Sequence, residues 1–94
     1  MDKKERKYRI RKIFNICLEI QESGKGENGH PMVEFECKNH GSPTIVWIMD
    51  NGWTDKGFDG VYYPCDSDDE YSKCVNHLKR LLRKIKEDKT CTQE

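Results

Sequence analysis

An amphipathic pattern near the carboxyl end constrains this chain more than any other feature. Ser67 and Glu70 have the spacing of a capping box, in which the serine caps the first helical turn and the glutamate reaches back to it. The apolar residues that follow recur at helical spacing and form one stripe: Tyr71, Cys74, Val75, Leu78, Leu81, Leu82 and Ile85. The opposite face carries cations: Lys73, Lys79, Arg80, Arg83 and Lys84. The pattern predicts a helix from about Asp68 to Glu87 that buries its stripe on a sheet.

Three segments before this helix have the pattern of strands. In residues 33–38 apolar and charged residues alternate, as in a strand with one buried face. Residues 44–49 are apolar on both faces, which predicts the central strand, and the Asn51-Gly52 pair after them is a turn signal. Residues 61–63 form a third, short run.

Residues 8–21 fit two patterns. The even-numbered apolar residues alternate as in a strand: Tyr8, Ile10, Phe14, Ile16, Leu18 and Ile20. A helix fits equally well, with Asp2 and Glu5 as its cap and Gly24 as its stop, and with these residues at helical spacing: Ile10, Ile13, Phe14, Cys17 and Leu18. Four isoleucines and the absence of alanine favour the strand. The expected fold class is α+β: a small antiparallel sheet of three or four strands with the C-terminal amphipathic helix packed on one face.

The length of 94 residues predicts a single domain over residues 1–94, because a second core could not be closed with so little chain. We expect residues 1–7 to form a flexible basic arm and residues 89–94 a flexible tail. No run approaches the roughly 18 apolar residues that span a bilayer, and the amino terminus does not have the pattern of a secretory signal. We therefore expect a cytoplasmic protein with no membrane partner, whose five cysteines are reduced.

Charge is sorted by position along the chain. Seven of the 17 Lys and Arg residues lie in the first twelve residues, and six more lie between Lys79 and Lys89. Residues 13–77 hold 12 of the 17 acids and four lysines, a local net charge of −8. Although the formal net charge of the chain is zero, its two ends are basic and its middle is acidic. Such a charge distribution can orient a charged partner.

A Cys-x-Asn-His pattern occurs twice and gives a candidate zinc site: Cys37, His40, Cys74 and His77. Zinc takes four such ligands in a tetrahedron. The alternative is that Cys37 and Cys74 are small apolar residues of the core. Because the gap of 33 residues between the pairs matches no standard zinc spacing, no metal or cofactor is expected.

The acidic middle of the chain is the candidate protein-binding site. Its residues are Trp53, Asp55, Phe58, Asp59, Tyr62, Asp66, Asp68 and Asp69. Exposed aromatic residues anchor protein interfaces, and the surrounding acids favour a partner with a cationic surface. The alternative is that Trp53 and Phe58 fold back over one end of a small core.

The basic ends give a second candidate, a nucleic-acid-binding regulator. The cations that would contact phosphates are Lys3, Lys4, Arg6, Lys7, Arg9, Arg11, Arg80, Arg83 and Lys84. If residues 2–22 were helical, the order α-β-β-β-α would resemble a double-stranded-RNA-binding domain. That family has a basic cluster at the start of its last helix, where this chain has residues 66–70, Asp-Ser-Asp-Asp-Glu. None of the family's residues is therefore carried over.

Catalytic motifs are lacking: the chain has no nucleophile elbow, phosphate loop or Cys/His pairing of the catalytic kind, so no enzyme activity is expected. A short chain with an acidic middle and no alanine looks like the accessory proteins of bacterial mobile elements, including phage. Some of these, such as anti-CRISPR proteins, inhibit nucleases by placing acidic side chains in a nucleic-acid channel. This resemblance of general character implies a non-catalytic inhibitor that binds a nucleic-acid-handling enzyme.

Overall fold

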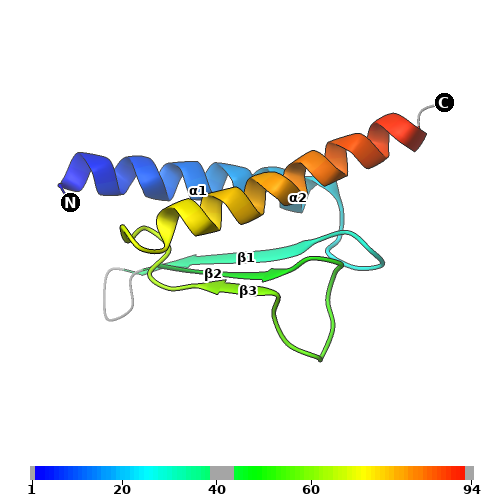
Figure 1. Ribbon diagram of the computed structural model, residues 1–94, viewed down its shortest axis with the longest axis horizontal. Helices are drawn as coiled ribbons and strands as arrows, with labels where there is room; N and C mark the ends of the chain where they lie inside the picture. Colours follow the sequence, from blue (N-terminus) through cyan, green and yellow to red (C-terminus); the bar gives the residue numbers. More distant parts are fainter. Residues whose placement is uncertain (1, 39–43, 93–94) are drawn as a thin grey trace.

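Two helices cover one face of a three-stranded sheet (Figure 1). The computed structural model describes residues 2–38 and 44–92, and the side chains of residues 2–38 and 44–88. The elements follow in the order α1 (Lys3–Ser23), β1 (Met32–Cys37), β2 (Thr44–Met49), β3 (Gly60–Tyr62) and α2 (Tyr71–Thr92). The expected α+β class, with an antiparallel sheet and the C-terminal helix packed on it, is confirmed.

The sheet has the order β1-β2-β3, and both pairings are antiparallel. The strand predicted to be central, β2, is hydrogen-bonded on both sides. Phe35 pairs with Val46, and Val46 pairs with Tyr62, so these three side chains share the face toward the helices. Alternate residues of each strand face the other way.

Residues 8–21 form a helix, so the strand favoured by the isoleucine content is wrong. Ile13, Ile16, Cys17 and Ile20 are buried at the spacing of one helical face, whereas Phe14 and Leu18 of the alternating set are exposed. Asp2 caps α1 by accepting a hydrogen bond from the Glu5 backbone at 2.8 Å, and Gly24 ends the helix. Burial of the helical stripe outweighs the weak strand propensity of isoleucine.

The second helix begins later and ends later than predicted. The Ser67 hydroxyl accepts a hydrogen bond from the Glu70 backbone at 3.2 Å, which confirms the cap. Residues 68–70 form a turn, and regular helix begins at Tyr71 and continues to Thr92. The predicted stripe is the buried face of α2: Cys74, Val75, Leu78, Leu81 and Ile85 are buried, and Tyr71 and Leu82 pack against them.

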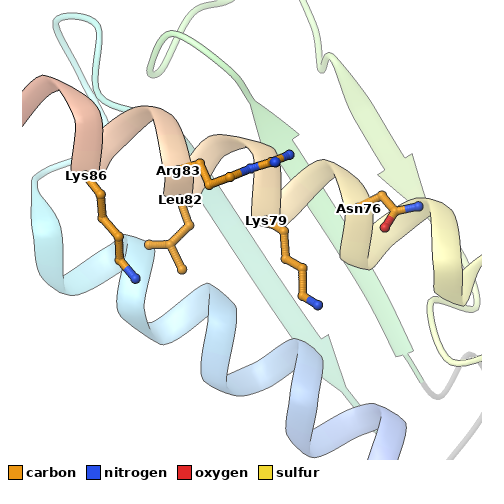
Figure 2. A pocket seen from close by; sticks show the side chains of 5 residues that line it. All are labelled: Asn76, Lys79, Leu82, Arg83 and Lys86. Atoms are coloured by element: carbon orange, nitrogen blue, oxygen red, sulfur yellow. The ribbon is translucent and has the colours of Figure 1, made fainter.

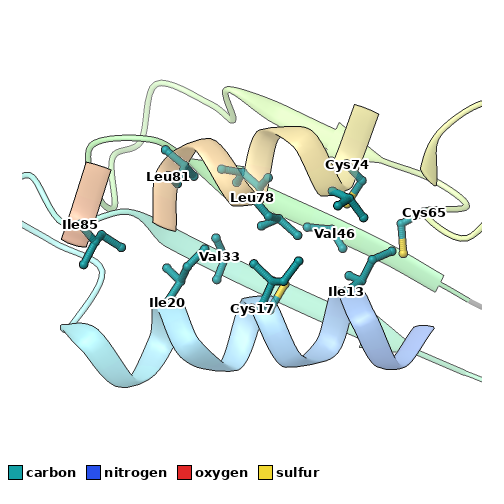
Figure 3. Close-up of a cluster of buried hydrophobic side chains, with 13 residues drawn as sticks. Ile13, Cys17, Ile20, Val33, Val46, Cys65, Cys74, Leu78, Leu81 and Ile85 are labelled. Atoms are coloured by element: carbon teal, nitrogen blue, oxygen red, sulfur yellow. The ribbon is translucent and has the colours of Figure 1, made fainter. Parts of the chain in front are cut away.

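The core lies between the helix layer and the sheet. Its largest fully buried apolar side chains come from both helices and the central strand: Ile13, Ile20, Val46, Ile48 and Leu78. Figure 3 shows Ile13, Ile20, Val46 and Leu78 between the helices and the sheet. Each such residue contributes roughly 1.5–3 kcal/mol by leaving water. The described cysteines, Cys17, Cys37, Cys65 and Cys74, are free thiols, and all but Cys37 are buried.

The two predicted flexible ends fall largely within the helices. Residues 3–7 form the first turns of α1, and the backbone of residues 89–92 continues α2. Capping by Asp2 explains the start of α1, because the cap satisfies a backbone donor of the first turn. No helix in the described ranges is long and apolar enough to cross a membrane.

Candidate binding surfaces

The face of the sheet opposite the helices carries apolar side chains. Glu34 pairs with Trp47, and Trp47 pairs with Val61, so these residues face away from α1 and α2. Ile45 has the same parity in β2. Both helices lie on the other side of the sheet (Figure 1). We call Ile45, Trp47, Val61 and the adjacent Phe58 the open face.

The aromatic residues of the β2–β3 loop are exposed and do not cover the core. Trp53 is 67% exposed and Phe58 is 44% exposed. The Phe58 ring lies beside Trp47, with ring centroids 6.5 Å apart. The Trp53 backbone donates to the Gly26 carbonyl at 2.7 Å, which ties this part of the loop to the segment after α1. The loop therefore holds two aromatic side chains in water, and one of them, Phe58, lies against Trp47 of the open face.

The acids predicted to act together lie in two places. Asp55 and Asp59 belong to the β2–β3 loop, and both are exposed. Asp59 accepts a hydrogen bond from the Asp50 backbone at 2.7 Å, so it also shapes the turn. Asp68 and Asp69 precede α2, at the end of the helix layer.

Asp66 is buried, unlike the other acids of the predicted binding site. It is 4% exposed, it accepts a hydrogen bond from the Thr44 hydroxyl, and its Oδ2 lies 3.2 Å from Arg6 Nε. Arg9 Nη1 bridges the Asp66 carbonyl at 3.0 Å and Asp68 Oδ1 at 2.9 Å. The fold thus pairs two cations of one predicted surface with two acids of the other.

Tyr62 lies on the side of the sheet that faces the helices and is half-buried, and its role in binding stays a prediction. Its hydroxyl lies 2.8 Å from Nδ1 of His77, and Nε2 of His77 lies 2.6 Å from Asp50 Oδ1. Burial raises the pKa of Tyr62, so the hydroxyl stays protonated at neutral pH. Both ring nitrogens of His77 have partners, and the chain of three residues ties β3 and the β2–β3 turn to α2.

The four residues of the candidate zinc site are not seen to converge. Cys74 is fully buried in the core, Cys37 is exposed, and His77 uses both nitrogens within the fold. His40 lies outside the described residues. Within the ranges 2–38 and 44–88, no group of three or more His, Cys, Asp or Glu side chains could hold a metal ion.

The predicted basic residues divide into engaged and unengaged cations. Arg6 and Arg9 pair with acids, Arg80 lies 3.9 Å from Asp50, and Lys84 donates to Asn51 at 3.4 Å. In the described part of the chain, five of the predicted cations are exposed and have no carboxylate within 4 Å: Lys3, Lys4, Lys7, Arg11 and Arg83. These five can contact a ligand without breaking an existing ion pair.

The element order is the one on which the resemblance to a double-stranded-RNA-binding domain depended, because residues 3–23 are helical. The acidic residues before α2 remain where that family has its basic cluster. Comparisons of the chain with protein-family models, with curated proteins and with solved structures found no match.

Sequence reasoning missed Ile45, Trp47 and Val61 as surface residues. The sequence did indicate this, because residues 44–49 are apolar on both faces, and in the described part of the chain both helices pack on the same face.

Proposed function

We propose that this domain is a non-catalytic module that binds another protein through the open face. The observation that carries the proposal is the outward side of β2, where Ile45 and Trp47 are half-buried and the helices cover only the opposite side of the sheet. A sheet normally buries its apolar face against a second layer. Val61 is 48% exposed and Phe58 44%, so a partner would remove this apolar area from water.

Charge around the open face favours a cationic partner. Glu34 is the cross-strand neighbour of Trp47, and Asp55 and Asp59 lie in the loop that carries Phe58. Such acids would attract a basic surface and orient it over the aromatic residues. A second copy of the chain is disfavoured as occupant, since a symmetric pairing would bring the same acids together.

A nucleic-acid-handling enzyme is the partner class that this chemistry fits. Enzymes of that kind bind phosphate backbones through clusters of Lys and Arg. An acidic and aromatic face docked on such a cluster would block the enzyme by competition. In this form of the proposal Glu34, Asp55 and Asp59 act as the acids, and the buried Asp66 has a structural role.

The test is capture of a partner by tagged protein from lysate of the source cells after nuclease treatment. Trp53→Ala with Phe58→Ala removes two exposed aromatic side chains beside the sheet. The matched control is Tyr8→Ala with Leu18→Ala, which removes two exposed apolar side chains from α1. Glu34→Lys with Asp55→Lys reverses the acidic charge, and Glu19→Lys with Glu22→Lys is its control on α1.

We expect a stoichiometric protein partner that both sheet-side variants lose and both α1 controls retain. The identified partner should then bind the purified domain, and the two sheet-side variants should weaken that binding at least about tenfold, the effect of losing one or two interface anchors. Equal loss in the α1 controls, or no effect of the aromatic substitutions, would reject the open face. If the domain elutes as a dimer and the aromatic substitutions make it monomeric, the open face binds a second copy of the chain and not a cationic partner.

A further inference from the structure

The outer side of the helix layer forms a second surface, separate from the open face. The two helices lie side by side on the sheet and run in the same direction (Figure 1). A hollow of about 440 Å³ lies along α2, lined by Asn76, Lys79, Leu82, Arg83 and Lys86. In Figure 2 the side chains of Lys79, Leu82 and Lys86 point from α2 toward α1. Lys79 and Lys86 therefore lie at the junction of the two helices, whereas the Arg83 side chain points away from α1.

The other helix adds a row of cations. Lys4, Lys7 and Arg11 are spaced three and four residues apart, so they share one exposed side of α1. They line a further hollow of about 440 Å³, together with Lys12. The buried stripe of α1 points to the sheet, so these cations point away from it. We call Lys4, Lys7, Arg11, Lys12, Lys79 and Arg83 the helix-layer surface.

Five of these six cations are exposed, and Lys12 is half-buried with its Nζ 5.8 Å from the centre of the Tyr8 ring. Across residues 2–38 and 44–88, no carboxylate lies within 4 Å of any of them, whereas Arg6 and Arg9 are engaged by Asp66 and Asp68. Unpaired cations at this density repel one another, and an anionic ligand relieves that repulsion. The surface is therefore suited to a ligand with many regularly spaced negative charges.

We infer that the helix-layer surface binds the phosphate backbone of a duplex nucleic acid. Neutralising several phosphates releases condensed counterions, which provides affinity without reading the base sequence. The surface spans two adjacent helices, whose axes pack roughly 8–10 Å apart, so its charges are spread over a width that a duplex can contact. Binding here leaves the open face on the other side of the domain accessible.

A membrane and a single strand fit this surface less well. Helices that lie on a lipid surface place a continuous apolar face in the bilayer, whereas the continuous apolar stripes of α1 and α2 are buried in the core. The large apolar residues that α1 exposes are Tyr8, Phe14 and Leu18. Single-strand binders stack bases on successive aromatic side chains, whereas Tyr8 is the aromatic residue beside the α1 cations. A duplex backbone needs neither feature.

The experiment is a fluorescence-anisotropy titration of the full chain. The probes are fluorescein-labelled 20-base-pair duplexes of DNA and of RNA, a matching single strand, and phosphatidylserine-containing vesicles. One variant changes α1 (Lys7→Glu with Arg11→Glu) and another changes α2 (Lys79→Glu with Arg83→Glu). The control variant, Lys25→Glu with Lys56→Glu, makes the same change in charge at exposed loop cations. Circular dichroism checks folding, which these exchanges preserve because Glu, Lys and Arg have similar helix propensity.

We expect one or both duplexes to bind, with affinity falling steeply as salt rises. Each helix variant should weaken duplex binding at least about tenfold and flatten the log–log salt slope by about 1.8, since each phosphate contact contributes about 0.9. The control should stay within about twofold of the wild type. No duplex binding below about 10⁻⁴ M at low salt, or equal loss in the control, would overturn the inference. So would loss in only one helix variant, or preferential binding of the single strand or of vesicles.

Discussion

The Thr44 hydroxyl donates a hydrogen bond to the buried carboxylate of Asp66. Thr44 is the first residue of β2, and Asp66 lies in the turn before α2, 22 residues further along the chain. Arg6 of α1 approaches the same carboxylate at 3.2 Å. One side chain therefore holds the sheet and both helices together at the end of the domain where the helices begin.

Removing this carboxylate should destabilise the fold. Asp66→Ala is expected to lower the free energy of unfolding by about 1–3 kcal/mol, because the buried Thr44 hydroxyl loses its acceptor. Thr44→Val should have a similar effect, and the double variant should cost less than the sum of the two. Urea denaturation measures all three. Asp69→Ala, at an exposed position nearby, is the control and should stay within about 0.5 kcal/mol of the wild type.

The hydrogen bonds from His77 to Tyr62 and Asp50 should also stabilise the fold. Tyr62→Phe removes one hydroxyl and is expected to cost about 1 kcal/mol. His77→Ala also opens a cavity and leaves Oδ1 of Asp50 without its hydrogen bond to His77, so it should cost about 2–4 kcal/mol. Chemical denaturation separates the two values. A Tyr62→Phe variant as stable as the wild type would show that the hydroxyl gains as much from water as from His77.

Stability should fall in alkaline solution through the buried thiol of Cys17. Burial, reinforced by the neighbouring Cys65, raises the pKa of Cys17 from 9.0 to about 12. Between these two values the unfolded chain releases a proton that the folded chain keeps, so the free energy of unfolding falls as pH rises. The contribution is complete below about pH 9 and is lost toward pH 12.

The measurement compares the wild type with Cys17→Ala by urea denaturation at about pH 8 and about pH 10.5. The difference in stability between the two proteins should shrink by about 2 kcal/mol, at about 1.4 kcal/mol for each pH unit above 9. A difference that stays constant with pH would contradict a raised pKa at this thiol.

Two glycines with left-handed backbone allow the stability cost of backbone strain to be measured separately from the cost of steric crowding. Gly52 has a φ of +100°, and a Cβ there would lie 2.8 Å from the Glu27 Cα. Gly57 has a φ of +111° and open space around it. Gly57→Ala should therefore cost about 1–2 kcal/mol, the strain alone, and Gly52→Ala clearly more. If thermal unfolding shows equal losses of stability in the two variants, the loop containing Glu27 moves aside at no cost in free energy.

The elements of this fold were largely predictable from local patterns. The α2 stripe and the alternation in β1 each have a single period, and both predictions are confirmed. Residues 8–21 satisfy both periods, because Ile10 and Phe14 belong to both sets. Local propensity could not decide between them, and packing of Ile13 and Cys17 in the core did.

The surfaces were harder to predict, because they depend on contacts between distant segments. Arg9 and Asp68 are 59 residues apart, and nothing near either one indicates their ion pair. Burial of Asp66 likewise depends on Thr44 and on Arg6. The sequence left open whether Trp53 and Phe58 are exposed or cover one end of the core. Both are exposed, and the backbone of Trp53 is attached to Gly26, a contact that the sequence does not indicate.

The common direction of α1 and α2 has an electrical consequence. Peptide dipoles in each helix leave a partial positive charge of about half an elementary charge at its amino end and a matching negative charge at its carboxyl end. Because the two helices run the same way, these dipoles add, whereas antiparallel neighbours would cancel. A polyanion that approaches the helix layer therefore meets a potential gradient along the helix axes and has a preferred end at which to arrive first, beside the first turns of α1.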